Sequence, residues 1–234
     1  MILNNKFSLK PLLSIGVILV GIIGVLTLIG SGGGSDNDNG DTPPPDDPPP
    51  IFAVAPVDIT YQPGSGRYGQ IDPDSPMMLP FGARLETGVL SPAIEYFTVL
   101  GADVRASADG VVVGVNRNPA PQTDFEIHIK PFPQSRYLFV YDHILDPAIT
   151  QDEEITAGTI LGKIGDWDHD TGRIELQINV AREDRSELAF CPTQFGNAAF
   201  NSQNEALLRA ANVRRVDAGR DPWPAVCLVE TVVP

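Results

Sequence analysis

The chain has 234 residues, of which 30 are acidic and 16 basic, so its formal net charge at pH 7 is -14. A charge balance this acidic repels a phosphate backbone, which argues against nucleic acid as a partner. The length is enough for one domain with a sizeable core, and three histidines leave little room for a hidden site built on imidazole.

An uncharged run opens the chain. Residues 11–30 carry no charged side chain, and the ten residues before them contain Lys6 and Lys10 but no acidic residue. About 20 uncharged residues span the hydrocarbon core of a bilayer. Because lysines favour a cytoplasmic N-terminus, residues 1–30 are predicted to be a transmembrane signal-anchor that sends the rest of the chain across the membrane. A cleaved signal peptide is the alternative; a lipoprotein signal would need cysteine where Ser31 stands.

Two segments without a helix or strand pattern follow. Residues 31–50 are glycine, serine, aspartate, asparagine and proline with one threonine and no large apolar side chain, so they cannot bury enough surface to fold. A disordered linker is predicted there. Residues 51–78 are rich in proline, glycine and polar side chains and are predicted to be an extended segment on the domain surface.

Residues 79–180 contain short runs rich in β-branched residues, interrupted by glycine. Apolar and polar residues alternate in several of these runs, as they do in half-buried strands. No connection between them is long enough for a crossover helix, so the sheet is predicted to be antiparallel. His128 alternates with two isoleucines and is expected to be a solvated strand residue, and residues 167–172 are expected to form a loop.

The C-terminal extension, residues 181–234, has one helix pattern and the chain's two cysteines. Residues 204–212 offer an apolar face and are predicted to form a short helix that packs on the sheet as a lid. Because Cys191 and Cys227 both lie in the translocated part, a disulfide is the simplest prediction, with two buried thiols as the alternative.

Short motifs occur in a fixed order within residues 79–180. They are Phe81-Gly82-Ala83-Arg84, Ser91-Pro92-Ala93-Ile94-Glu95, Gly101-Ala-Asp-Val104-Arg-Ala106, Tyr141-Asp142-His143-Ile144 and Arg173-Ile174-Glu175-Leu176. Their order resembles the LytM-type, lysostaphin-like zinc endopeptidases, which cleave peptide cross-links in bacterial peptidoglycan. The resemblance implies a mainly β domain of the duplicated hybrid motif type, an antiparallel sheet or barrel-sandwich. Together with the signal-anchor predicted from residues 1–30, the resemblance implies a protein of the bacterial cell envelope, anchored in the inner membrane with a periplasmic or otherwise extracytoplasmic domain.

The resemblance also shows which positions of the family's zinc site have changed. The three zinc ligands of the family fall on Ser91, Glu95 and Glu175, and its two further histidines fall on His143 and Arg173. A serine hydroxyl is a poor zinc ligand and both ligating imidazoles are gone, so a non-catalytic, peptidase-like domain without a cofactor is predicted. The alternative is an active metallohydrolase with zinc on Glu95 and Glu175 and His143 as the catalytic candidate.

By the same resemblance, the predicted partner is peptidoglycan or a cell-wall protein such as a wall hydrolase. The predicted ligand-binding groove is formed by Phe81, Arg84, Glu95, His143, Trp167, Arg173 and Glu175. A plainer interpretation is that Glu95, Glu175 and Arg173 form a salt bridge that replaces the metal as a cross-link between strands. A structural or adaptor module with an occluded groove is the remaining alternative.

Overall fold

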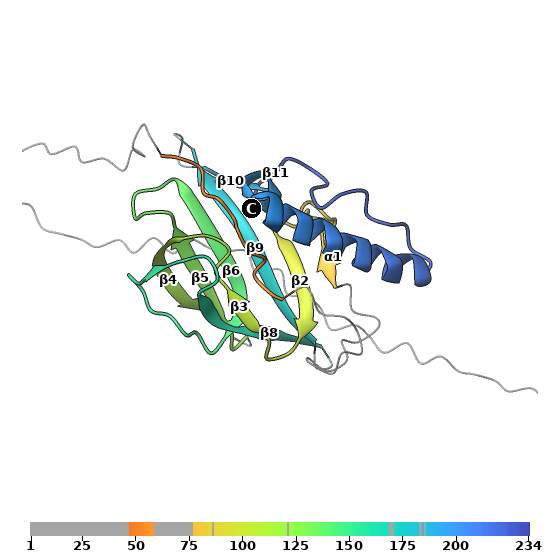
Figure 1. Cartoon of the computed structure of the whole chain (residues 1–234), viewed down its shortest axis with the longest axis horizontal. Helices are drawn as coiled ribbons and strands as arrows, with labels where there is room; N and C mark the ends of the chain where they lie inside the picture. The colour runs from red at the N-terminus through yellow and green to blue at the C-terminus, as the bar shows by residue number, and fades with distance from the viewer. Residues whose placement is uncertain are drawn as a thin grey trace, which may run out of the picture. The chain divides into compact units, whose positions relative to one another are not determined.

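An eleven-stranded sheet organises the folded part of the computed structural model (Figure 1). The structure describes residues 47–58, 77–85, 87–120, 122–168, 171–182, 184 and 186–234. The predicted membrane anchor, most of the predicted linker and the larger part of the predicted surface segment lie outside these residues. Within the described residues, no helix has the length and apolar character needed to cross a membrane.

Every strand pairing is antiparallel, as the alternating pattern and short connections predicted. The main path runs β1-β2-β9-β8-β6-β5-β4-β7, with β3, β10 and β11 at its sides. The strands are β1 (Met78–Leu79), β2 (Ile94–Val99), β3 (Asp103–Arg105), β4 (Gly110–Arg117), β5 (Phe125–Lys130), β6 (Tyr137–Leu145), β7 (Glu154–Ile155), β8 (Ile160–Asp168), β9 (Thr171–Ala181), β10 (Glu187–Phe190) and β11 (Thr231–Val232).

Strand β9 is the centre of the sheet, because it pairs with β2, β6, β8 and β10. Its side chains alternate between two faces, as in any strand. Ile174, Leu176 and Ile178 are fully buried in the core. The residues that alternate with them, which include Arg173 and Glu175, lie on the opposite face. This one strand therefore separates the core from the polar face.

Of the predicted surface segment before the sheet, the structure describes residues 51–58 and 77–78, and part of this stretch is buried. Phe52 is fully buried, and its ring packs between Phe139 and Phe200 at centroid distances of 5.1 and 5.5 Å. The backbone amide of Phe52 donates to Phe195 O at 2.8 Å. The segment is therefore part of the core, because burying a large aromatic ring stabilises the fold more than leaving it in water.

One helix, α1 (Ala198–Asp217), covers the core face, preceded by the 3-10 turn η1 (Pro192–Phe195). It is longer than the nine residues predicted, because Asn197 caps it by accepting from Phe200 N at 2.9 Å. Tyr96 of β2 donates its hydroxyl to Asn204 of α1 at 2.7 Å. Since Tyr96 and Glu95 point to opposite faces of β2, α1 does not cover the polar face and is not the predicted lid.

The predicted disulfide between Cys191 and Cys227 is confirmed. It ties the start of η1 to the C-terminal segment, which runs beside Phe81: Phe81 N donates to Val226 O, and Leu228 N donates to Phe81 O, both at 3.0 Å. The predicted loop 167–172 is shorter than expected, because Trp167 belongs to β8 and β9 already begins at Thr171. Trp167 is the bulged residue between Asp166 and Asp168, which are paired with Gly172 and Thr171.

Candidate functional site

Three carboxylates stand in one row across the polar face of the sheet. Glu95 of β2 is the register partner of Glu175 of β9, which in turn is the partner of Asp142 of β6. Directly opposed residues of antiparallel strands lie on the same face with neighbouring side chains, and like charges placed so destabilise the sheet. A neighbouring cation, or a proton on one of the carboxylates, relieves this repulsion.

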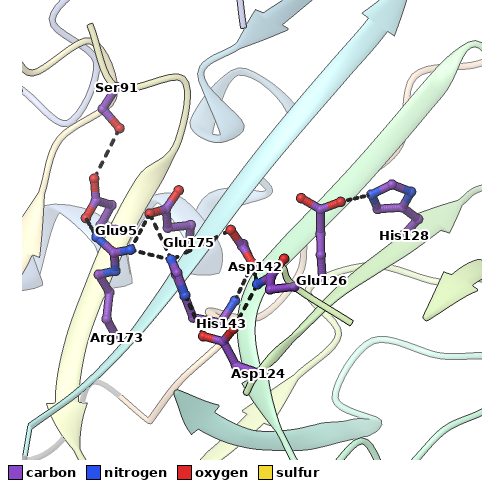
Figure 2. Close-up of polar contacts among 10 residues, drawn as sticks. Ser91, Glu95, Asp124, Glu126, His128, Asp142, His143, Arg173 and Glu175 are labelled. Carbon is purple, nitrogen blue, oxygen red and sulfur yellow. Dashed lines mark hydrogen bonds and ion pairs between the residues drawn. The ribbon is translucent and has the colours of Figure 1, made fainter. Parts of the chain in front are cut away.

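Arg173 supplies that cation from the same face of β9, two residues before Glu175 (Figure 2). Its Nη1 lies 3.4 Å from Glu95 Oε2, and its Nη2 lies 3.2 Å from Glu175 Oε1. The guanidinium also lies 4.3 Å from the centre of the Trp167 ring, a cation-π contact. The guanidinium thus bridges two neighbouring strands and is held in place by an aromatic ring.

His143 completes the cluster at the point where β6 changes partner from β9 to β8. Its φ of 65° is in the left-handed region, which non-glycine residues seldom adopt. The Nδ1 atom is 2.7 Å from Asp124 Oδ2, and Nε2 is 3.5 Å from Glu175 Oε1 and contacts Arg173 Nη2. The unusual backbone therefore aims the imidazole at both the carboxylates and the guanidinium.

Asp124 was not among the residues that the sequence pointed to. It precedes β5, is buried, and is fixed by Asn118, whose Nδ2 donates to Asp124 Oδ1 at 2.9 Å and to Asp142 Oδ1 at 2.7 Å. No motif includes Asp124, and its partner lies 19 residues away in sequence. Only the folded arrangement of β5 and β6 brings the two together.

The environment shifts the proton affinities of the cluster strongly. Burial alone would lower the pKa of His143, but hydrogen bonds to Asp124 and Glu175 outweigh it and raise that pKa to about 9. Burial, with repulsion from Glu175, raises the pKa of Glu95 to about 7. The pKa of Glu175 is lowered: burial opposes this shift, but the His143 hydrogen bond and the Arg173 charge outweigh it.

The proton on His143 Nε2 decides which neighbour the ring binds. A neutral imidazole that donates Nδ1–H to Asp124 keeps a lone pair on Nε2 and accepts from Arg173. Adding a proton turns Nε2 into a donor, which faces Glu175 Oε1 at 3.5 Å and excludes the Arg173 hydrogen bond. The titratable ring of His143 thus lies between a hydrogen-bond donor, Arg173, and a hydrogen-bond acceptor, Glu175.

Ser91 lies at the edge of the cluster and is almost fully buried. Its hydroxyl lies 3.4 Å from Glu95 Oε1 and donates to Ala93 O at 3.1 Å. The backbone of Ser91 is paired with the first motif, since Gly82 N donates to Ser91 O at 2.9 Å and Ser91 N donates to Ala83 O at 2.8 Å. The first motif therefore positions the second.

The structure brings together five of the seven predicted groove residues, namely Glu95, His143, Trp167, Arg173 and Glu175. Phe81 differs from the prediction, because its ring is fully buried in the core and is not available to a ligand. Arg84 is exposed on a loop, where its Nη1 donates to Gly88 O at 2.5 Å. Within the described residues, no hydrogen bond or ion pair joins Arg84 to the cluster.

A second histidine–carboxylate pair, His128 with Glu126, lies on β5. His128 Nε2 lies 2.5 Å from Glu126 Oε1 on β5, and both side chains are about a quarter exposed. His128 was expected to be a solvated strand residue, and it is partly solvated with one carboxylate partner. Over the described residues, no group of three or more His, Cys, Asp or Glu side chains has a geometry that could hold a metal ion.

No protein-family model matches the sequence, and no curated protein matches it. Solved structures with a similar backbone include lysostaphin, an antimicrobial peptidase from Staphylococcus simulans, at 17% identity and a TM-score of 0.43, over 52% of this chain and 52% of that chain. LytU is similar at 14% identity and a TM-score of 0.42, over 56% of this chain and 90% of its own. The catalytic domain of a point mutant of EnpA, a prophage-encoded M23 protein from Enterococcus faecalis, is similar at 20% identity and a TM-score of 0.38. The match covers 44% of this chain and 79% of that chain.

This chain thus matches about half of the length of the lysostaphin chain. A shared backbone does not carry a chemistry with it, because function depends on the side chains at the site. What the cluster does therefore follows from its own residues.

Proposed function

We propose that this chain is a membrane-anchored, extracytoplasmic relative of the LytM-type endopeptidases that binds peptidoglycan or a wall hydrolase and does not cut peptide bonds. The proposal is supported by the convergence of separate motifs in one cluster on the polar face of the sheet. Ser91, Glu95, His143, Arg173 and Glu175 come from positions that the resemblance assigns to the family's site. The anchor is supported by the uncharged run at residues 11–30.

The observation that carries the proposal is the place of the Arg173 guanidinium. It lies between Glu95 and Glu175, at 3.4 and 3.2 Å from their oxygens, and also contacts His143 Nε2. Zinc in a hydrolase needs three ligands, usually with imidazole among them, and an open position for water. A serine, two carboxylates and a guanidinium that satisfies both carboxylates do not fit zinc, so we derive no hydrolytic step.

The binding role is supported by the side of the cluster that reaches solvent. Trp167 is 40% exposed, although Arg173 lies over its ring and Phe97 meets it edge to face at 5.7 Å. An exposed aromatic ring held rigidly by its neighbours gives a large contact area at a low cost in conformational entropy. Trp167 is therefore the expected anchor for a wall ligand.

The first test measures metal and cleavage together. The full chain, purified without chelators and then exposed to zinc, is expected to hold no stoichiometric zinc and to leave cross-linked peptidoglycan peptides intact. About one tightly held zinc per chain, with cleavage that Glu175→Ala abolishes, would overturn the proposal in favour of a carboxylate-rich metallohydrolase.

The second test measures binding to purified sacculi. Trp167→Ala is expected to weaken co-sedimentation of the full chain about tenfold, because a single exposed aromatic anchor contributes that much to a small interface. Trp223→Ala is the matched control. Trp223 follows α1 in the chain, its ring packs against Arg215 of α1, and it does not belong to the cluster. Equal loss in both variants, or wild-type binding by Trp167→Ala, would refute the role of the cluster in wall binding.

One observation favours a structural module as a second candidate. Ser91, Glu95 and His143 are only 1%, 4% and 8% exposed, so the middle of the cluster is closed to a ligand. In this case Arg173 acts only as the cross-link between β2 and β9. A chain that folds stably and does not sediment with sacculi under any condition would assign it this role.

A further inference from the structure

A second polar feature is lined by residues of β2, β3 and β8 and of the turn between β2 and β3. It is a cavity of about 190 Å³. Its wall includes Asp58, Thr98, Gly101, Asp103, Arg105 and Lys163. Two acidic and two basic side chains thus surround one space, in a protein whose overall charge is -14.

This cavity is separate from the cluster around Arg173. Thr98 belongs to the cavity wall, whereas its neighbour Phe97 meets Trp167 at the cluster. Consecutive residues of a strand point to opposite faces, so β2 stands between the two sites. A ligand in the cavity would therefore not touch Glu95 or Glu175.

Among the described residues of the cavity wall, Arg105 is the basic group without an ion-pair partner, whereas Lys163 is paired with Asp103. Within the described residues, its guanidinium makes no hydrogen bond, ion pair or ring contact, although the side chain is only partly exposed. A guanidinium presents its N–H donors in a planar fork that matches the two oxygens of a carboxylate. Arg105 is therefore a ready receptor for a small oxyanion.

Asp103 and Lys163 form the second charged element of the wall. They are register partners on β3 and β8, and Lys163 Nζ lies 2.5 Å from Asp103 Oδ1. Their side chains are 36% and 46% exposed, and ion pairs this exposed contribute little to stability. A ligand ammonium can therefore share Asp103 with Lys163 at small cost.

The shape of the wall agrees with an open space for a ligand. A Cβ added at Gly101, whose φ is +86°, would meet no atom of the described residues within 4 Å. The volume far exceeds the ~10–15 Å³ that one water needs, and it is smaller than the ~300–1,000 Å³ of pockets that hold drug-sized ligands. It matches a ligand the size of an amino acid or a dipeptide.

We propose that this cavity binds a small zwitterion of the amino acid or dipeptide class. Its carboxylate lies on Arg105, with the Thr98 hydroxyl as a further partner, and its ammonium lies on Asp103. This site is independent of the proposed wall-binding role, because it uses the other side of β2.

The test titrates the full chain with glycylglycine by calorimetry, and with two half-ligands. N-acetylglycine keeps the carboxylate without the ammonium, and glycinamide keeps the ammonium without the carboxylate. Saturable binding of glycylglycine, with both half-ligands at least about tenfold weaker, is the expected result, because each lacks one charged hydrogen-bond partner. No saturable binding of glycylglycine, or N-acetylglycine binding as tightly as glycylglycine, would overturn the proposal.

Variants assign the binding to this cavity. Arg105→Gln is expected to weaken glycylglycine about tenfold or more, and Thr98→Val about two- to tenfold, because the first removes a charged donor and the second a neutral one. Arg117→Gln is the matched control, since Arg117 is exposed at the far end of β4. Should Arg105→Gln fold poorly, Thr98→Val still decides the matter, because wild-type affinity in a folded Thr98→Val would refute the assignment.

Discussion

His143 and His128 lie on the adjacent strands β6 and β5, and each imidazole pairs with a carboxylate (Figure 2). The His128 pair is local, because Glu126 is two residues away on the same strand, and both side chains are about a quarter exposed. The His143 pair joins separate parts of the chain, and its side chains are only about one tenth exposed. The chemical pair is the same, but its surroundings differ.

The difference shows that burial and the number of neighbours decide what such a pair contributes. Around His143, carboxylates from three segments, Asp124, Asp142 and Glu175, face one ring, and the Arg173 guanidinium balances them. Buried charges are stable only when every partner is present, whereas a solvated pair exchanges its partner for water at little cost. Breaking the first cluster should therefore cost several times more than breaking the second.

Removing the central cation should have the largest effect. Arg173→Met is expected to lower the free energy of unfolding by about 3–5 kcal/mol, because buried Glu95 then loses the cation at 3.4 Å and keeps the like-charged Glu175 as its neighbour. Urea denaturation at pH 8 measures it. Arg209→Met, which breaks an exposed pair with Glu205 at 3.9 Å, is the control and should change stability by less than about 0.5 kcal/mol.

Part of the stability lost in Arg173→Met should be restored when one of the carboxylates is neutralised. Adding Glu95→Gln to Arg173→Met is expected to restore about half of the lost stability, since one buried charge is removed with little change in shape. A loss below about 1 kcal/mol in Arg173→Met, or no repair by the second change, would mean that the guanidinium does not hold the cluster together.

The pH dependence of the free energy of unfolding should come from the buried cluster, through His143 and Glu95. The folded-state pKa of His143, about 9, is above its ordinary 6.5, so His143 stabilises the fold fully below pH 6.5 and this contribution is lost as the pH rises through 9. The raised pKa of Glu95, about 7 against 4.5, acts in the same direction between pH 4.5 and 7. Stability is therefore expected to fall by on the order of 1–3 kcal/mol between pH 5 and pH 10.

His143→Asn separates the contribution of the ring from that of the rest of the chain. Asparagine tolerates the left-handed backbone but does not titrate, so the decline above pH 7 should flatten in this variant. Urea midpoints from pH 5 to pH 10 give the comparison, and an unchanged slope in His143→Asn would refute the assignment.

Much of the fold could be predicted from the sequence, because strands follow from local alternation. The antiparallel sheet and the disulfide were predicted correctly, and the motif order placed Glu95, Arg173 and Glu175 where the structure brings them together. Those predictions needed only local pattern, or a resemblance whose motifs already imply the register of β2 and β9.

The rest depends on contacts between residues distant in sequence. Asp124 has no motif around it, and Phe52 lies in a proline-rich segment without hydrophobic periodicity, yet one holds His143 and the other fills the core. The N-terminal turns of α1 were missed for a different reason: they lack an apolar stripe and are fixed by Asn197 as the cap. Local pattern cannot report such tertiary partners.

The glycines opposite the two histidines extend the comparison to the backbone. A Cβ at Gly165 would lie 2.6 Å from His143 O and 2.8 Å from His143 Cβ, too close for either backbone to stay in place. Gly165→Ala is therefore expected to cost about 1–3 kcal/mol, as overpacking does, in thermal or urea unfolding.

Gly114, across from His128, is the matched control for Gly165. A Cβ there would lie 3.5 Å from His128 Cβ and 3.1 Å from the Asn116 amide nitrogen, which ends a side chain that can move. Gly114→Ala should stay within about 1 kcal/mol of wild type, since lost chain entropy in the unfolded state offsets a small adjustment. Equal costs at both glycines would contradict a close fit that is specific to His143.

The smallest effect on stability is expected from breaking the partly exposed pair of His128 and Glu126. His128→Gln and Glu126→Gln should each change the free energy of unfolding by less than about 1 kcal/mol, and 1 M salt should reduce even that difference, because a partly solvated pair is screened. Urea unfolding at pH 6 in low and high salt measures it. A loss above about 2 kcal/mol that salt does not reduce would mean that the His128 pair is bound into the sheet as firmly as the His143 pair. Neither exposure nor the number of facing carboxylates would then decide how much a histidine–carboxylate pair contributes to stability.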